Sequence, residues 1–148
     1  AGQRPPARGG PRCGRCVELA AEDGSLWEIW AGANAAENDQ LSLKEGRPHE
    51  LWLHAAGVPG AHVLVRRAGG GPEARPPKDV VVAAAGLAAH RSKARAASRV
   101  KVHVTTCGRL GKARGAPPGE VVLRGHYEAM TVRPLDQPQP CRPPRPGQ

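Results

Sequence analysis

The sequence predicts a single α+β domain in which a mostly antiparallel sheet packs against one long helix and one shorter helix. Apolar and polar residues alternate in segments 26–30, 51–54 and 100–105, which is typical of half-buried strands. In segment 78–95, apolar residues recur at three- and four-residue spacing, which is typical of an amphipathic helix. The chain has 148 residues. After its two tails are set aside, roughly 110 to 120 residues remain, enough for one domain.

A predicted hairpin over residues 50–66 forms the part of the sheet around which the other segments are organised. Two leucines alternate with Trp52 and His54, and a short segment with two glycines and a proline leads into a second strand. His54 ends the first strand and His62 begins the second. We therefore expect both imidazoles at the same end of the sheet, with Trp52 on the face of His54.

Two segments are expected to be helical. Asn34 is a good N-cap for a short helix that continues through Leu43, and Glu37 at the third helical position completes a capping box. The longer helix over 78–95 follows two prolines and carries Asp79 in its first turn, where the positive end of the helix dipole favours an acid. Its last turns carry more positive charge than a helix cap alone requires.

The remaining strands follow the long helix. Segment 100–105 is expected to have a basic outer face, and segments 121–123 and 127–132 are predicted to form a second hairpin. A long connection, 108–119, is rich in glycine and basic residues, and loops of this length in compact domains are often functional. Its backbone amides beside basic side chains suit a phosphate. It is not a Walker loop, because Gly-Lys-Ala replaces Gly-Lys-Ser/Thr and no helix follows.

Both ends of the chain read as disordered tails, with the domain between them at 17–136. Residues 1–16 are rich in Gly, Pro and Arg, and residues 137–148 are rich in proline. No apolar segment near the start resembles a secretory signal. The arginines of the first tail fit either a transit-peptide remnant or a basic RNA-binding arm. We expect a cytoplasmic protein, or an organellar one if the transit-peptide interpretation holds.

The four cysteines predict neither a zinc site nor a disulfide framework. Cys13 and Cys16 form a CxxC pair, but no second pair exists, and Cys107 and Cys141 lie far apart in the sequence. The pair does not begin a helix, which argues against a thioredoxin-like role. We interpret the cysteines as incidental thiols and expect no metal and no cofactor.

Charge is distributed unevenly along the chain. The formal net charge is +9 and the isoelectric point is about 10.3, which favours a polyanionic partner or an acidic membrane surface. Segment 80–119 contains no acid and eight basic residues. The favoured interpretation is an anion-binding face, and the alternative is an arginine-rich composition without a binding role. No apolar run of about 18 residues occurs, so no transmembrane helix is expected.

Several motifs in order resemble the NFACT-R domain, also called DUF814. The motifs are Glu50-Leu-Trp-Leu-His-Ala, Gly57-Val-Pro-Gly-Ala-His-Val, Gly32-Ala-Asn, Glu37-Asn-Asp, Ser92-Lys-Ala-Arg and Lys112-Ala-Arg-Gly-Ala-Pro-Pro-Gly. The resemblance extends over residues 26–134. It implies an RNA-binding domain, related to one that handles tRNA on the large ribosomal subunit in larger ribosome-rescue proteins. The family motif usually has Arg where this chain has Ala33, so one positive contact is missing.

The expected function is a non-catalytic module that recognises structured RNA. The resemblance implies tRNA or rRNA, with the ribosome or its quality control as the setting and the large ribosomal subunit as a further candidate partner. No membrane and no DNA are expected. The chain has too few aromatic residues to stack several single-stranded bases. The predicted RNA-contacting residues are Asn34, Trp52, His54, His62, Arg66, Lys93, Arg95, Lys112 and Arg114.

Two alternatives remain open. One is a hydrolase or metal-dependent nuclease that uses His54, His62 and a nearby acid, although nucleophile elbows, HExxH and suitably placed paired carboxylates are missing. The other is a permanently ribosome-bound structural or assembly protein, which the basic tails would suit.

Overall fold

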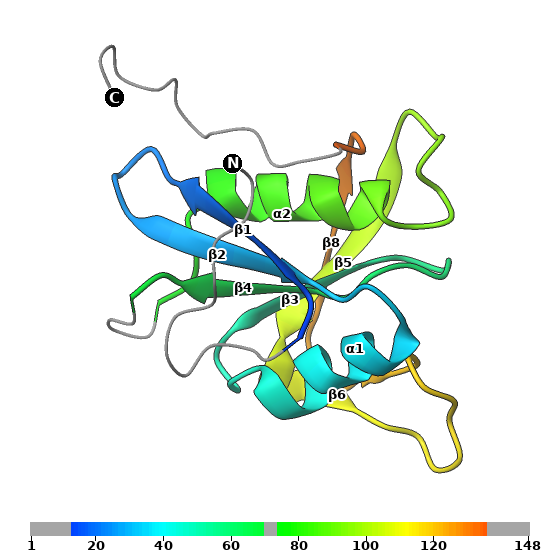
Figure 1. Cartoon of the computed structure of the whole chain (residues 1–148). Coiled ribbons are helices and arrows are strands. Elements are labelled where there is room, and N and C mark those ends of the chain that lie inside the picture. Colours follow the sequence, from blue (N-terminus) through cyan, green and yellow to red (C-terminus); the bar gives the residue numbers. More distant parts are fainter. Residues whose placement is uncertain (1–12, 70–73, 136–148) are drawn as a thin grey trace.

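The computed structural model describes residues 13–69 and 74–135. Its main strands are β1 (Arg15–Ala20), β2 (Leu26–Ala31), β3 (Leu51–Ala55), β4 (Val63–Arg67), β5 (Val100–Thr106) and β8 (Glu128–Val132). They form one six-stranded antiparallel sheet in the order β1-β2-β4-β3-β5-β8 (Figure 1). Two short strands, β6 (Leu110–Gly111) and β7 (Val122–Leu123), pair separately.

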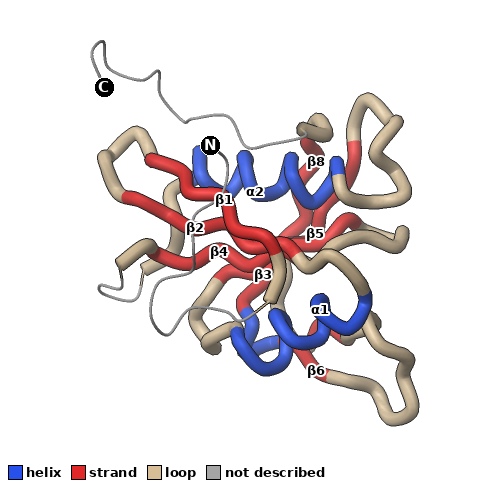
Figure 2. The backbone as a smooth tube through the Cα atoms, in the orientation of Figure 1, coloured by secondary structure: helices blue, strands red, loops and turns tan. Residues whose placement is uncertain are grey.

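Helices lie on both faces of the sheet, which gives three layers (Figure 2). Helix α2 (Lys78–His90) covers one face and packs Val80, Val81, Leu87 and its alanines on the larger core. The short helix α1 (Ala35–Asp39) continues into a π-helical segment, η1 (Gln40–Glu45), on the other face. Leu41 of η1 packs there in a smaller core with Trp30, Trp52 and Leu64. The predicted α+β class is therefore confirmed.

Strand periodicity explains how β3 serves both layers. Because successive side chains of a strand point to opposite faces, Leu51 and Leu53 enter the core under α2 while Trp52 enters the smaller core. The hairpin with β4 is confirmed, and Leu51 lies opposite Val65 in its register. Every residue of β3 except His54 is buried, as expected for a strand near the middle of a sheet covered on both sides.

The predicted start of α1 is also confirmed. The Oδ1 atom of Asn34 accepts a hydrogen bond from the backbone N–H of Glu37 at 2.9 Å. In return the Glu37 carboxylate accepts from the N–H of Ala33 at 3.0 Å, one residue further back than in a standard capping box.

The long helix is five residues shorter than predicted, because the chain after His90 forms hydrogen bonds with the β3–β4 loop. The N–H of Ala61 donates to Arg91 O at 3.0 Å, and the N–H of Lys93 donates to Pro59 O at 2.9 Å. The Ser92 hydroxyl also donates to a carbonyl of the last helical turn at 2.7 Å. The segment after α2 therefore pairs with the β3–β4 loop instead of continuing the helix.

The predicted second hairpin, 121–123 with 127–132, is wrong. Strand β7 pairs with β6, and β8 pairs with β5, placing Val132 opposite Val100. The edge beside β5 lets Val132 join the core under α2. A two-residue strand such as β7 has too few ladder positions to compete for that place.

The amino-terminal boundary also differs from the expectation. Strand β1 begins at Arg15, inside the segment assigned to the first tail, and Cys16 pairs with Trp30 across the β1–β2 ladder. Cys16 is buried in the smaller core. The tail predictions for 1–12 and for 137–148, with Cys141, fall outside the described residues. Within the described ranges, no helix has the length and apolar character needed to cross a membrane.

Candidate nucleic-acid interface

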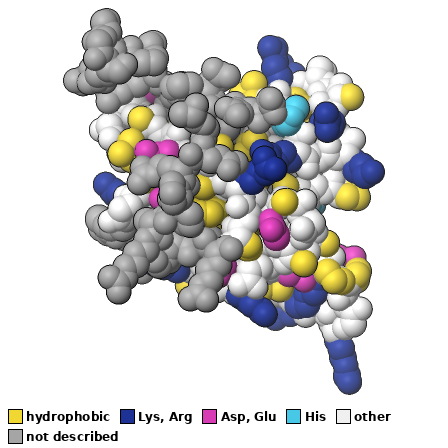
Figure 3. All heavy atoms as spheres, in the orientation of Figure 1, with side chains coloured by type: hydrophobic (Ala, Val, Ile, Leu, Met, Phe, Trp, Pro, Cys, Tyr) yellow, Lys and Arg dark blue, Asp and Glu magenta, His cyan; other side chains and the backbone are white. Residues whose placement is uncertain are grey.

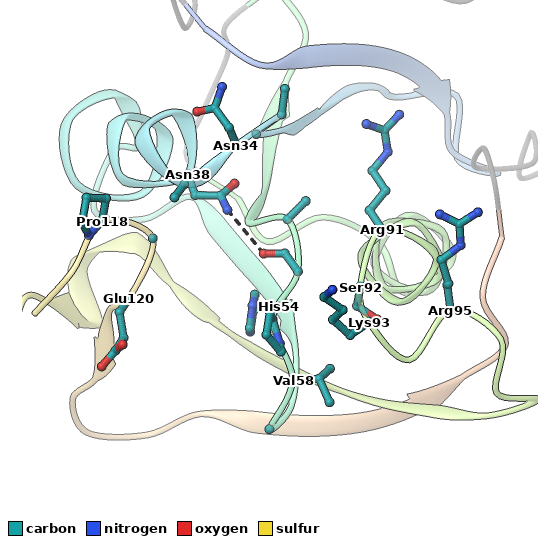
Figure 4. A pocket seen from close by; sticks show the side chains of 18 of the residues that line it. Asn34, Asn38, His54, Val58, Arg91, Ser92, Lys93, Arg95, Pro118 and Glu120 are labelled. Atoms are coloured by element: carbon teal, nitrogen blue, oxygen red, sulfur yellow. Dashed lines mark hydrogen bonds between the residues drawn. The ribbon is translucent and has the colours of Figure 1, made fainter.

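An open groove of about 1360 Å³ lies where five parts of the chain meet. Its walls are Arg15 of β1, the start of α1, the β3–β4 loop, the segment after α2, and residues 118–120 (Figure 4). Figure 4 shows Arg91, Lys93 and Arg95 at the end of α2, across the groove from Pro118 and Glu120. The groove thus lies between residues of segment 80–119, which contains no acid, and residues 32–34 before α1.

Positive charge dominates the groove. The charged residues among its described lining are Arg15, Arg91, Lys93, Arg95 and Glu120. Lys93 and Arg95 are exposed, and neither forms an ion pair with a described residue. Figure 3 shows Lys and Arg side chains gathered on the right-hand side of the visible face, around the end of α2. An anion in the groove would meet cations with spare hydrogen-bond donors.

The β3–β4 loop on the groove floor is held rigidly from two sides. Asn38 of α1 donates through Nδ2 to Gly60 O at 3.3 Å, as Figure 4 shows, and accepts through Oδ1 from the N–H of His62 at 3.0 Å. On the other side, a Cβ added to Gly60 would stand 2.8 Å from the Cβ of Ser92. Glycine is required at this position because the two backbones approach so closely.

A chain of buried hydrogen bonds connects the sheet to the opposite wall of the groove. Trp52 Nε1 donates to Ser42 Oγ at 2.8 Å, and Ser42 Oγ lies 2.6 Å from His62 Nδ1. His62 Nε2 lies 2.9 Å from Gly119 O. A carbonyl only accepts, so Nε2 carries the proton and Nδ1 accepts from the Ser42 hydroxyl. His62 is thus a neutral structural residue that anchors residues 118–120.

The environment of His62 also keeps it neutral. Burial, followed by the charge of His54, lowers the pKa of His62 from 6.5 to about 4. The two rings lie 5.1 Å apart between centroids, and Trp52 stacks on His54 at 5.8 Å. Burial is also the main cause that lowers the pKa of His54. The expectation that both imidazoles lie at one end of the sheet, with Trp52 beside His54, is confirmed.

Lys112 organises the loop 112–120 instead of projecting from it. Its ammonium donates to Asp39 Oδ2 at 2.9 Å, Pro117 O at 2.6 Å and Glu120 O at 2.9 Å. These acceptors occupy the three donors of the ammonium group. The loop is therefore folded back on itself and held against the end of α1.

Arg66 also lies in the interior. Its Nε is 2.5 Å from Glu50 Oε2, its terminal nitrogen is 2.6 Å from Glu50 Oε1, and the same nitrogen donates to Glu45 O at 2.9 Å. Arg66 is 7% exposed and Glu50 5% exposed. This bidentate pair ties β4 to the chain just before β3.

The structure divides the nine predicted RNA-contacting residues into three groups. Asn34, His54, Lys93 and Arg95 line the groove together. Lys112 and Arg114 do not line it, although Arg114 is exposed in the adjoining loop. Trp52, His62 and Arg66 lie in the interior: they are 2%, 2% and 7% exposed, and internal partners occupy their polar atoms.

Two basic residues of the groove are not among the nine predicted RNA-contacting residues. Arg91 belongs to the basic segment 80–119 and has a four-residue spacing from Arg95, although the helix ends at His90. Arg15 was assigned to the tail, so its position in β1 beside the groove could not be anticipated.

The geometry gives no support to a hydrolase that uses His54 and His62. Both ring nitrogens of His62 are engaged, with Ser42 and with Gly119. Within residues 13–69 and 74–135, no group of three or more His, Cys, Asp or Glu side chains could hold a metal ion.

Comparison with known proteins gives consistent matches. The family model described as "NFACT protein RNA binding domain" matches residues 20–127. A protein named Rqc2 homolog RqcH from Streptococcus suis (strain 05ZYH33) is 36% identical over 108 residues, and one from Bacillus subtilis (strain 168) is 33% identical over 108 residues. Each match covers 73% of this chain but 18% of the relative, so the chain spans about a fifth of their length.

A solved structure matches as well. It is titled as the C-terminal of the fibronectin/fibrinogen-binding protein from Streptococcus suis, and the match has a TM-score of 0.68 at 36% identity. The match covers 80% of this chain and 45% of that chain. Together these findings confirm the family resemblance drawn from the sequence motifs.

Proposed function

Because the chain belongs to the NFACT RNA-binding domain family, we propose that it is a non-catalytic module that binds structured RNA in the groove beside α2. The observation that carries the proposal is the wall formed by Arg91, Lys93 and Arg95, which faces one acid, Glu120, among the described lining residues. Phosphates are the anions that such a row of cations suits.

The rigidity of the groove supports recognition by shape. Hydrogen bonds that need no ligand hold three of its walls: Asn38 of α1 binds the β3–β4 loop at Gly60 and His62, and His62 binds Gly119 of residues 118–120. Pre-ordered walls lose little conformational entropy when RNA binds. A groove of this kind suits the backbone of a folded RNA better than a flexible strand.

The RNA we favour is tRNA or rRNA, at the ribosome or in its quality control. This part of the proposal rests on the relationship to the RqcH proteins. The match covers 18% of their length, so the activities of the whole relatives are not carried over. The module would supply RNA contacts, and Arg114, exposed in the loop next to the groove, would supply a peripheral one.

The test measures binding to fluorescently labelled tRNA by anisotropy at several salt concentrations. The double variant Lys93→Ala/Arg95→Ala removes two phosphate contacts. The slope of log affinity against log salt concentration should therefore fall by roughly 1.4 to 1.8, at about 0.7 to 0.9 for each contact. Affinity itself should fall for every structured RNA, since backbone contacts carry no sequence information.

A matched control uses Lys44→Ala/Arg47→Ala, which removes the same net charge from two exposed residues outside the groove. This variant should retain the wild-type slope to within the error of one contact. An equal loss of slope in both double variants would mean that net charge, and not the groove, determines binding.

A further inference from the structure

Tyr127 differs from the other aromatic residues of the chain because its ring is exposed. The sequence contains three Trp, one Tyr and no Phe, and the three Trp are 2–3% exposed while Tyr127 is 46% exposed. Its ring lies 4.8 Å from that of His103, centroid to centroid, with a tilt of 60°. Packing of the core does not require an aromatic ring at this place.

The His103–Tyr127 pair adjoins the groove through the sheet. His103 on β5 lies directly opposite His54 on β3, and His54 lines the groove. The two histidines share the face of the sheet away from α2, because Val102 and Val104 of β5 point into the core under that helix. The pair is thus one strand away from the groove floor.

Positive charge accompanies the ring pair. Lys101 is exposed and stands two residues before His103 on β5, so both side chains lie on one face about 7 Å apart along the strand. The nearest acid on β8, Glu128, alternates with Ala129 and therefore points to the other face, where it pairs with Arg75. The exposed ring of Tyr127 suits the flat face of a base, and Lys101, opposite Thr131 and so four residues along β8 from Tyr127, suits a phosphate further along the same RNA strand.

We propose that the His103–Tyr127 pair is a stacking site for one unpaired nucleobase of the RNA whose backbone lies in the groove. This inference rests on the proposed function and makes it more specific, since the preferred ligand becomes a folded RNA with a loop or bulge beside its stem. Bases inside an A-form duplex are already stacked, and only a splayed nucleotide offers a face to a side chain. A single exposed ring accommodates one base, which agrees with the scarcity of aromatic residues.

The test compares two RNA probes with the same stem, a blunt duplex and a hairpin with an unpaired loop. Tyr127→Ala should weaken hairpin binding by between about fivefold and about 100-fold, the scale of one lost base–aromatic stack. Duplex binding should stay unchanged. Tyr127→Phe keeps the ring and should retain most of the hairpin affinity. Leu26→Ala, at a residue equally exposed at 46%, is the matched control and should change neither affinity.

The outcomes separate this inference from the function on which it rests. If Tyr127→Ala changes both affinities equally or neither, the stacking site is refuted. If Lys93→Ala/Arg95→Ala keeps full affinity for both probes, the groove proposal fails whatever Tyr127 shows. Absence of binding by the wild-type protein would overturn both. A 2-aminopurine in the loop gives a second readout, because its fluorescence should respond to binding by the wild-type protein and not by Tyr127→Ala.

Discussion

Acid should destabilise the protein through His62, and replacing this residue should remove most of that effect. In the folded state, the pKa of His62 is lowered from 6.5 to about 4 by burial and by His54. Between these two values the unfolded chain binds a proton that the folded protein does not. Stability is therefore fully present above pH 6.5 and is lost as the pH falls toward 4.

The magnitude follows from the two pKa values. The full shift corresponds to about 3 kcal/mol, and the part expressed between pH 7.5 and pH 5 is about 2 kcal/mol. His62→Gln also removes the hydrogen bonds to Ser42 and Gly119, which should reduce the free energy of unfolding by about 2 kcal/mol at pH 7.5. The informative quantity is thus the difference between the two pH values, not the stability at either one.

The assay is urea unfolding of wild type and His62→Gln at pH 7.5 and pH 5. His126→Gln, at an exposed residue, is the control and should lose as much stability on acidification as wild type. Burial lowers the pKa of His54 as well, so a smaller acid loss of the same sign should remain in His62→Gln. An acid loss in His62→Gln as large as in wild type would refute the reasoning. So would an NMR titration that places the imidazole of His62 near pH 6.5.

Three further predictions concern residues that hold loops and strands of the fold in place. In a double-mutant cycle by thermal or urea unfolding, Lys112→Ala and Asp39→Asn should show a coupling of about 0.5 to 1 kcal/mol, because the pair is partly exposed; additive effects would contradict the ion pair. Glu50→Ala should cost about 3 to 5 kcal/mol of unfolding free energy, since it leaves Arg66 buried without its carboxylate, and a loss below about 1 kcal/mol would show that the pair is not needed. Gly60→Ala should cost about 1 to 3 kcal/mol and weaken RNA binding, because the added methyl group has no space; unchanged stability would mean that the loop moves freely.

Features that depend on local chemistry could be predicted from the sequence. The alternation in 51–54 determines which side chains of β3 share a face, and the structure confirms it through the stacking of Trp52 on His54. The cap of α1 follows from the short reach of the Asn34 side chain to the third N–H of the helix. The charge pattern of 80–119 indicated Lys93 and Arg95, because residues that are neighbours in sequence at the end of a helix also lie close together in space.

Features that depend on competition between distant partners could not be predicted in this way. The end of α2 depends on hydrogen bonds from the β3–β4 loop, and nothing within 78–95 indicates that loop. Strand β8 pairs with β5 and not with β7, its neighbour in sequence. The ladder with β5 is longer than one with the two-residue β7, and it brings Val132 into the core under α2.

Competition between distant partners also decides which of the predicted RNA-contacting residues are available to RNA. Lys112 and Arg114 look alike in the sequence. In the structure, Lys112 pairs with Asp39, which lies 73 residues away, and Arg114 remains exposed. His62 resembles a candidate ligand until Ser42 and Gly119 take both of its nitrogens. The sequence by itself determined the kind of surface this protein has, because periodicity and charge are local. Only the tertiary structure decided which polar atoms remain available to a ligand, because a buried donor or acceptor takes whatever partner the fold brings near it.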